Sequence, residues 1–462
     1  MTRLLCSPPA AAARASGTAV PSGRRRLAAT AASCGSPRLR LDCWGATMRR
    51  TTVPPPTCSG RARPAGACRS HMPAWNDSYD GSCPDVVGNS RWDVLGLGQA
   101  IVDFSASVDE DFLEFSGVPK GGRKVISVDE RGSVLSTLDG SSYKVNAGGS
   151  LSNTLVALAR LGRAEAQLTG STPLRVGLGG SIGCDALGEF YKAKIQKAGV
   201  EFISEPQLNS ATGTVVVLTT DDAQRSFLSY PGTAHDLVTD AATGAIDNCR
   251  ALVIEGYLWE MPGALEGISH AVKKARQSGT LVVMTAGDPG VVQRHKAEML
   301  SVLELGVDVM FTNAHEAAAL VGIDADEEQC AEEAAMMLAS HATLGVVTDG
   351  RRGAYIAGLG RVQHVEPHWA TDKPIDTCGA GDAYAAGVLY GLLNGYDIPS
   401  MGKFGARVAS AVISRYGARL KKDDALKLAQ EMAVSPAHGA LLPPERPPRS
   451  KAPSKSQLRP IP

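Results

Sequence analysis

Along the middle of the chain, short apolar runs alternate with longer segments whose apolar residues recur at helical spacing. The short runs are rich in Val, Ile and Leu and are bounded by Gly or polar residues, so they predict buried strands. Such alternation predicts a mostly parallel sheet with helices on both faces. The predicted strands are 92–98, 175–182, 251–257, 280–285, 307–312 and 343–348, and the predicted helices are 154–161, 186–198, 262–277, 291–303, 314–321, 327–339, 380–393, 400–416 and 424–433.

One segment interrupts this alternation. Two strand-like runs, 213–220 and 225–230, flank a polar turn and predict a β-hairpin. We expect the hairpin to pair with a short strand at 143–146 in a small accessory sheet. Two glycines are expected to end helices, Gly162 after 154–161 and Gly199 after 186–198.

The two ends of the chain differ in composition from this middle part. Of the 47 basic residues, twelve are Arg within residues 1–75, where Asp42 is the only acid. The remainder therefore has a net charge of −11 (35 basic against 46 acidic residues), which argues against general nucleic-acid binding. Residues 1–80 are rich in Ala, Ser, Pro, Gly and Arg, which predicts disorder and is typical of a plastid or, less often, a mitochondrial transit peptide. The alternatives are an ordinary disordered tail and sequence upstream of a true start at Met48 or Met72. The Pro-rich residues 435–462 are also expected to be disordered.

The spacing of the cysteines and the hydropathy of the chain bear on metal binding, redox compartment and membrane insertion. None of the ten cysteines forms a CxxC pair, so a zinc site is not expected. The four in the middle part (Cys184, Cys249, Cys330 and Cys378) predict free thiols and a reducing compartment. No run of 18 apolar residues suggests a membrane span.

The stretch 376–387, DTCGAGDAYAAG, carries the strongest candidate chemistry. A helix that starts near Gly379 would direct free backbone N–H groups and the positive end of its dipole outward, as an anion site requires. Gly379 and Gly381 have no Cβ, so a ligand could come close to the backbone. Asp382 would then stand beside the anion as a general base. The alternative interpretation is an Asp that merely caps a helix.

A second glycine turn precedes the helix predicted at 154–161. It reads Gly148-Gly149-Ser150-Leu151-Ser152-Asn153 and again exposes backbone, with Asn153 on the first helical turn. The segment 96–101 only half matches a dinucleotide fingerprint, and there is neither a Walker A sequence nor a protein-kinase catalytic loop.

Together the two glycine motifs resemble the signatures of the PfkB family, the group of ribokinase, fructokinase and adenosine kinase. The resemblance spans about residues 91–433 and has both motifs in the expected order. It implies a ribokinase-like α/β three-layer sandwich with a mostly parallel central sheet. It also implies a small β-sheet lid, from about 104–147 and 211–232, that closes over the acceptor.

The resemblance also implies roles for individual residues. Asp382 would deprotonate a hydroxymethyl group of the acceptor, while the backbone of Gly379, Ala380 and Gly381 stabilises the transferred γ-phosphoryl group of ATP. Asp376 matches a position that helps to bind a monovalent cation such as K⁺. The residues matching acceptor-binding positions are Asp103, Gly148, Gly149 and Asn153, although Asp103 alone would be interpreted as a turn residue after a strand.

Three further elements match the nucleotide side of the family site. Asn313 and Glu316 resemble an Asn-x-x-Glu element whose Glu helps to hold Mg²⁺, usually through water, which suits the ligand preference of this ion. Arg225, otherwise an exposed hairpin charge, resembles a lid arginine of adenosine kinases that approaches the transferred phosphate. The expected nucleotide contacts are Asn313, Thr348, Gly350 and Gly353.

Two departures leave the acceptor open between a sugar and a ribonucleoside. Residues 285–290, TAGDPG, replace an Asp-Pro-Asn-x-Arg element, and Gln99 stands where adenosine kinases have Asn. Cys378 beside the anion site is either redox-sensitive or a small packing residue.

The sequence therefore predicts an ATP- and Mg²⁺-dependent kinase of a sugar or nucleoside in the chloroplast stroma. The alternative is a non-catalytic PfkB-like assembly component in plastid gene expression. A homodimer through the lid and a plastid complex are further expectations for its partners, and no membrane or direct nucleic-acid partner is expected.

Overall fold

The computed structural model of the chain describes residues 92–138, 143–222, 224–233, 240–325, 329–369 and 373–434. The predicted transit peptide and Pro-rich tail lie outside these residues. Within them the chain forms two sheets, a large one that carries most of the helices and a small one built from 101–147 and 213–230. In the described part of the chain, no helix combines the length and apolar character that crossing a membrane would require.

The large sheet contains nine strands in the order β14-β13-β12-β11-β10-β9-β1-β5-β6. Seven neighbouring strands of this sheet pair in parallel, namely β12, β11, β10, β9, β1, β5 and β6. Strands β13 and β14 are antiparallel additions at the edge next to β12. The predicted parallel sheet is thus confirmed. Its strands are β1 (Trp92–Leu97), β5 (Val176–Gly179), β6 (Val200–Phe202), β9 (Cys249–Ile254), β10 (Leu281–Thr285), β11 (Val309–Asn313), β12 (Leu344–Thr348), β13 (Ala354–Gly358) and β14 (Arg361–Val365).

Each central strand is buried on both faces, which explains the continuous apolar runs in the sequence. Val94 and Val253 belong to one hydrophobic core and Leu95 and Leu252 to another, because successive side chains of a strand point to opposite faces. The first core includes α3 (Ser150–Thr169), α4 (Ala186–Ala198), α10 (Ala380–Leu393), α11 (Ile398–Ile413) and α12 (Lys422–Val434). The second includes α5 (Asp240–Ile246), α6 (Ala264–Gln277), α7 (Pro289–Leu303), α8 (Ala314–Val321) and α9 (Cys330–His341).

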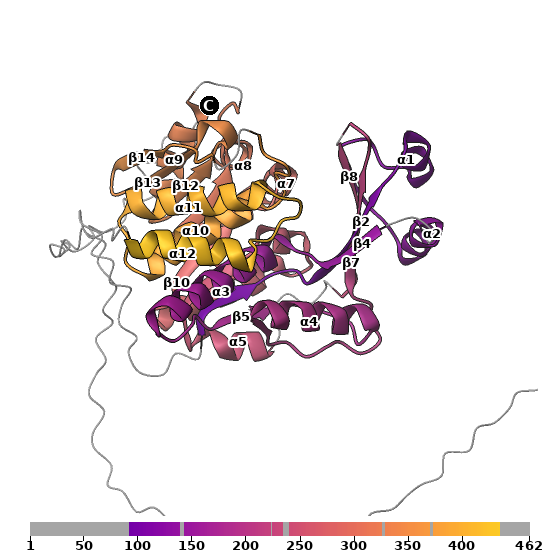
Figure 1. The fold of residues 1–462 in the computed structure, drawn as a ribbon, viewed down its shortest axis with the longest axis horizontal. Coiled ribbons are helices and arrows are strands. Elements are labelled where there is room, and N and C mark those ends of the chain that lie inside the picture. The colour runs from indigo at the N-terminus through magenta and orange to yellow at the C-terminus, as the bar shows by residue number, and fades with distance from the viewer. Residues whose placement is uncertain are drawn as a thin grey trace, which may run out of the picture. The chain divides into compact units, whose positions relative to one another are not determined.

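The small sheet has the order β3-β8-β7-β2-β4. Figure 1 shows it standing away from the helices that cover the large sheet, with α1 (Glu110–Ser116) and α2 (Val128–Leu138) beside it. One of its faces is buried: Phe104 and Leu228 share a core with Leu113 of α1 and Val134 of α2. The other face carries Asp103, Arg123 and Arg225 among other residues. The strands are β2 (Ile101–Ser107), β3 (Arg123–Val125), β4 (Tyr143–Ala147), β7 (Gly213–Thr219) and β8 (Arg225–Tyr230).

Most predicted elements are confirmed, several to the residue, such as α4 and α10. The predicted hairpin is β7 and β8, but the strand at 143–147 pairs with β2 and not with the hairpin, because β2 lies between them. Gly162 does not end α3. A Cβ at that position would lie 2.6 Å from Leu174 Cγ, so the glycine serves close packing inside the helix, which continues to the left-handed Gly170. Elements that the sequence did not predict are α1, β2, β3, α2, β6, α5, β13 and β14, together with the short 3₁₀ helices η1 (Gly256–Glu260) and η2 (Gly350–Arg352).

Candidate functional site

The first turn of α10 has the form that the sequence predicted. Gly379 is its N-cap, with φ 75°, and no side chain caps the helix there. A Cβ on Gly379 would lie 2.4 Å from the Ala418 carbonyl oxygen, whereas one on Gly381 would meet no atom within 4 Å. The N–H groups of Gly381 and Asp382 have no acceptor within the helix, since they belong to its first turn. The amide of Ala380, also expected to face an anion, instead donates to Thr377 O at 3.2 Å.

The two glycine motifs meet at Asp382. Ser150 Oγ donates to Asp382 Oδ1 at 2.5 Å and Asn153 Nδ2 donates to Asp382 Oδ2 at 2.9 Å. Thr154 Oγ1 also donates to the Asp382 backbone carbonyl, at 3.2 Å. The first turn of α3 therefore fixes the carboxylate at the first turn of α10, 232 residues from Ser150 in the sequence.

The surroundings of Asp382 suit a group that exchanges a proton. Burial raises the pKa of Asp382, and the hydrogen bonds from Ser150 and Asn153 oppose this rise. Its charge in turn contributes to the raised pKa values of Glu255 and Glu316. Perturbed carboxylates of this kind are typical of functional sites, although ion-pair networks produce them too.

Asp103 lies in the middle of β2, opposite Asn146 of β4, so the interpretation as a turn residue is wrong. Its carboxyl group lies against Gly148, where an added Cβ would come within 2.2 Å of it. This close approach requires glycine at position 148. Burial raises the pKa of Asp103 to about 7, and the charge of Arg419 acts in the opposite direction.

Glu255, which follows β9 and is 1% exposed, was not among the site residues predicted from the sequence. Its carboxylate accepts from Gln99 N at 2.5 Å and Leu151 N at 3.0 Å, and it thereby holds the end of β1 to the start of α3. Burial raises the pKa of Glu255 to about 7. An acid directly after the apolar run 251–254 was the one signal that the sequence offered.

Arg419, on the segment between α11 and α12, was not predicted as a site residue either. Its Nε donates to Asn153 Oδ1 at 3.2 Å and its Nη2 to Ser152 Oγ at 3.1 Å. Burial lowers the pKa of Arg419. No local pattern distinguishes this arginine from others near the end of the chain.

Arg225 of β8 reaches across to the stretch that begins α10. Its Nη2 lies 2.9 Å from Asp376 Oδ1, and its Nη1 lies 2.6 Å from Cys378 Sγ. Asp376 also accepts from Cys378 N and Gly417 N, each at 2.9 Å. Burial acts to raise the pKa of Asp376, but Arg225 and these amides outweigh it, and the pKa is lowered. The carboxylate is therefore engaged by protein donors, and its expected role toward K⁺ stays a prediction.

Asn313 and Glu316 form a capping box at the start of α8. Asn313 N and Nδ2 donate to the Glu316 carboxylate at 2.9 and 2.6 Å, and Glu316 N donates to Asn313 Oδ1 at 2.9 Å. Burial raises the pKa of Glu316 to about 7, helped by the charges of Asp288 and Asp382. Among the described residues no group of three or more His, Cys, Asp or Glu is arranged to hold a metal. A single carboxylate still fits Mg²⁺ that keeps its waters and binds substrate phosphates.

Three of the four expected nucleotide contacts, Thr348, Gly350 and Gly353, lie together at the end of β12. Thr348 is its last residue, Gly350 begins the short helix η2 (Gly350–Arg352), and Gly353 follows. Thr348 Oγ1 donates to Thr312 O at 3.4 Å. Strand β12 lies beside β11, which ends at Asn313. Both strands end at the carboxyl edge of the sheet, where ligands bind in open α/β folds.

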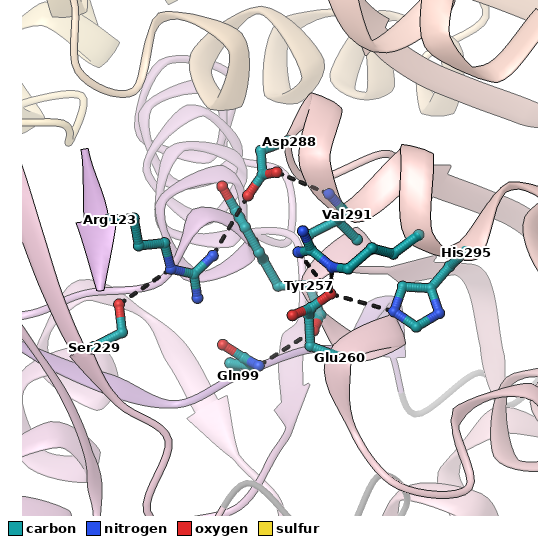
Figure 2. A network of polar contacts seen from close by, with 9 residues as sticks. Gln99, Arg123, Ser229, Tyr257, Glu260, Asp288, Val291 and His295 are labelled. Carbon is teal, nitrogen blue, oxygen red and sulfur yellow. Dashed lines mark hydrogen bonds and ion pairs between the residues drawn. The ribbon is translucent and has the colours of Figure 1, made fainter. Parts of the chain in front are cut away.

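A second arginine of the small sheet, Arg123, reaches the start of α7, as Figure 2 shows. Arg123 of β3 donates to Ser229 Oγ at 3.2 Å, lies 3.4 Å from Asp288 Oδ2 and stands over the ring of Tyr257 at 5.5 Å. Asp288 is the N-cap of α7, and Gln99 donates to Tyr257 O at 3.2 Å. Arg123 and Arg225 therefore join the small sheet at two points to the segments that lead into α7 and α10.

Comparison with known proteins gives the same family as the sequence motifs. Residues 122–425 match the family model described as pfkB family carbohydrate kinase. The chain is 26% identical over 279 residues to a 5-dehydro-2-deoxygluconokinase of Clostridium perfringens, covering 58% of this chain and 78% of the relative. It is 25% identical over 288 residues to a ribokinase of Haemophilus influenzae, covering 61% and 86%.

Solved structures of similar fold include kinases of both acceptor classes. The adenosine kinase of Sinorhizobium meliloti has 29% identity and a TM-score of 0.63, covering 74% of this chain and 99% of that one. A probable sugar kinase of Rhizobium etli has 27% identity and a TM-score of 0.64, covering 75% and 99%. The fold is therefore ribokinase-like, as the motifs predicted.

Proposed function

We propose that this chain, which belongs to the PfkB family of carbohydrate kinases, transfers the γ-phosphoryl group of ATP to a primary hydroxyl of a sugar or ribonucleoside. The observation that carries the proposal is the junction at Asp382. There a carboxylate oriented by Ser150 and Asn153 lies one residue from the open backbone at Gly381. A general base and an anion site are thus placed side by side.

In the proposed reaction, Asp382 accepts the proton of the acceptor hydroxyl, and the hydroxyl oxygen forms a bond to the γ-phosphorus of ATP. The bond from that phosphorus to the bridging oxygen breaks, and ADP leaves. Such transfer depends mainly on positioning and on charge stabilisation, which the N–H groups of Gly381 and Asp382 and the helix dipole supply. Mg²⁺ bound to the ATP phosphates would neutralise developing charge, with Glu316 holding it through water.

The small sheet is proposed to position the acceptor. Asp103 lies beside Gly148, on the face of the small sheet that also carries Arg123 and Arg225, and its carboxyl group is suited to accept hydrogen bonds from vicinal hydroxyls. Asn153 differs from the expectation, because its amide nitrogen and oxygen are engaged by Asp382 and Arg419. We therefore propose that Asp103 binds the acceptor's hydroxyls and that Asn153 mainly orients the general base Asp382.

The test is ATP-dependent phosphorylation of a panel that contains adenosine, ribose and 5-dehydro-2-deoxygluconate, followed by mass spectrometry. Replacing the base, Asp382→Asn, is expected to lower kcat at least about 100-fold, because general bases contribute 100- to 10,000-fold. Asp397→Asn is the matched control, since Asp397 is the N-cap of the neighbouring α11 and bonds only its own helix, to Ser400 N. Product formation that Asp382→Asn leaves unchanged, or no product with any acceptor, would refute the proposal.

A further inference from the structure

The segment Gly417-Ala418-Arg419 contacts both glycine motifs. Gly417 N donates to Asp376 Oδ2 at 2.9 Å. Ala418 lies so close to Gly379 that a Cβ there would come within 2.4 Å of the Ala418 carbonyl oxygen. Arg419 reaches the other motif, at the first turn of α3. Three consecutive residues thereby fix the start of α10 and the start of α3 relative to each other.

The contacts of Arg419 determine how the Asn153 amide is oriented. Because the Arg419 guanidinium carries only donors, Asn153 must turn its oxygen toward Arg419, at 3.2 Å. Its NH₂ group then points toward Asp382 Oδ2, at 2.9 Å. In the reversed orientation the amide oxygen would face the carboxylate and the amide nitrogen the guanidinium, so both contacts would be repulsive.

The second branch of the guanidinium supports the same turn. Arg419 Nη2 donates to Ser152 Oγ at 3.1 Å, and the single hydroxyl hydrogen of Ser152 is shared between Gly148 O at 2.5 Å and Gly149 O at 3.0 Å. Ser152 is fully buried, so these contacts hold the glycine turn from inside. The planar guanidinium is suited to this task because it presents several donors in a fixed geometry.

We propose that Arg419 is a positioning residue for phosphoryl transfer, which orients the general base Asp382 through the side chain of Asn153. Arg419 does not touch the reacting atoms in this assignment. It fixes the amide that holds the carboxylate, and a misplacement of about 1 Å at such a group can lower a rate about 100-fold. The inference rests on the proposed function of Asp382, but the link from Arg419 to Asn153 can be measured separately.

A double-mutant cycle with Arg419→Gln and Asn153→Ala tests the proposal, using Mg²⁺-ATP and the acceptors adenosine, ribose and 5-dehydro-2-deoxygluconate. Each single variant is expected to lower kcat about 100-fold with an unchanged KM for ATP. The double variant is expected to lose no more than the larger single loss, because both changes remove one chain of contacts. Losses that multiply would overturn the proposal, as would a loss seen in KM for ATP alone.

Two further variants separate positioning from charge and from general damage. Arg419→Lys retains the charge near Asp103 but not the planar fork, so it is expected to recover only a small part of the lost kcat; full recovery would refute the role of the fork. Arg415→Gln removes a neighbouring arginine that pairs with Asp424 at 2.6 Å, and its effect is expected to be small and to multiply with that of Asn153→Ala.

The same cycle measured by urea unfolding distinguishes failure of the inference from failure of the proposed function. Non-additive changes in the unfolding free energy are expected for positions 419 and 153, since the side chains are in contact. Additive changes would refute the link whatever the enzyme does. Coupled unfolding without turnover of any acceptor by the unsubstituted protein would refute the proposed function, and the catalytic part of this inference with it.

Discussion

Two glycines, Gly379 and Gly381, stand two residues apart at the start of α10, and the structure predicts opposite consequences for replacing them. In Gly379→Ala the new side chain must adopt φ 75°, which costs about 1–2 kcal/mol for an L-residue. Its Cβ would also lie 2.4 Å from a backbone oxygen and 2.7 Å from a Cβ, both of Ala418. Overpacking of this kind costs a further 1–3 kcal/mol or so. We therefore expect Gly379→Ala to lower the unfolding free energy by about 2–5 kcal/mol.

Gly381→Ala is the matched variant. Gly381 lies inside the helix without a positive φ, and an added Cβ meets no atom within 4 Å. Replacing glycine in a compatible conformation stabilises by about 0.4–1 kcal/mol through the unfolded state. The methyl group would, however, occupy the space in which an anion approaches the helix backbone. The N–H of residue 381 is retained, but an anion kept away from it loses one hydrogen bond, which costs about 100-fold in kcat or more.

Urea denaturation and steady-state kinetics of the two variants check this reasoning. Gly379→Ala is expected to have a lower unfolding midpoint, and Gly381→Ala an unchanged or higher midpoint together with greatly reduced turnover. A Gly381→Ala protein that retains the turnover of the unsubstituted enzyme would refute the anion site at this backbone. A Gly379→Ala protein of undiminished stability would refute the packing against Ala418.

Four other predictions follow from the site and the chain ends. Because burial raises the pKa of Asp103, the folded protein favours its protonated form. The stability that this residue contributes is full below pH 3.8 and is lost as the pH rises through about 7. The urea midpoint of Asp103→Asn should therefore match that of the unsubstituted protein near pH 4 and exceed it above pH 7. Glu316→Gln should raise the Mg²⁺ concentration needed for half-maximal turnover, and an unchanged magnesium titration would contradict the role given to Glu316. Arg225→Met should reduce kcat without unfolding the protein, because Asp376 keeps its two backbone amide donors. An intact fold by circular dichroism together with an unreduced kcat would exclude Arg225 from catalysis. A fusion of residues 1–80 to a fluorescent protein should enter plastids, and a cytosolic signal would refute the transit peptide.

The sequence predicted those parts of the site that are encoded locally. Helix α10 and the turn before it follow from a glycine-rich stretch that runs into small apolar residues, and α3 begins at the second glycine turn as expected. Asp382 and Asn153 were identified because each lies inside such a motif. Parallel strands buried on both faces gave apolar runs that could be recognised without knowledge of their neighbours.

The missed residues act over long distances in the sequence. Arg419 is 266 residues from Asn153, and Glu255 is 104 residues from Leu151, so neither contact leaves a local pattern. Asp103 looked like a turn residue because the strand that continues beyond it belongs to a different sheet from β1.

Helix α1 was missed for another reason. Its signals were present, namely the N-cap Asp109, two acids in the first turn and the left-handed Gly117, but its seven residues carry too few apolar positions to show a helical period.

The two arginine contacts of the small sheet differ in strength, and this difference has a consequence for acceptor entry. Arg123 and Asp288 are 39% and 31% exposed and 3.4 Å apart, so their ion pair is worth less than about 1 kcal/mol. Asp376 is 5% exposed, but it keeps the amides of Cys378 and Gly417 if Arg225 withdraws. Neither contact leaves a buried charge without partners when it opens. Opening these two arginine contacts to admit an acceptor would therefore cost little electrostatic free energy, and the apolar core that the small sheet shares with α3 and α4 is what would resist separation of the two sheets.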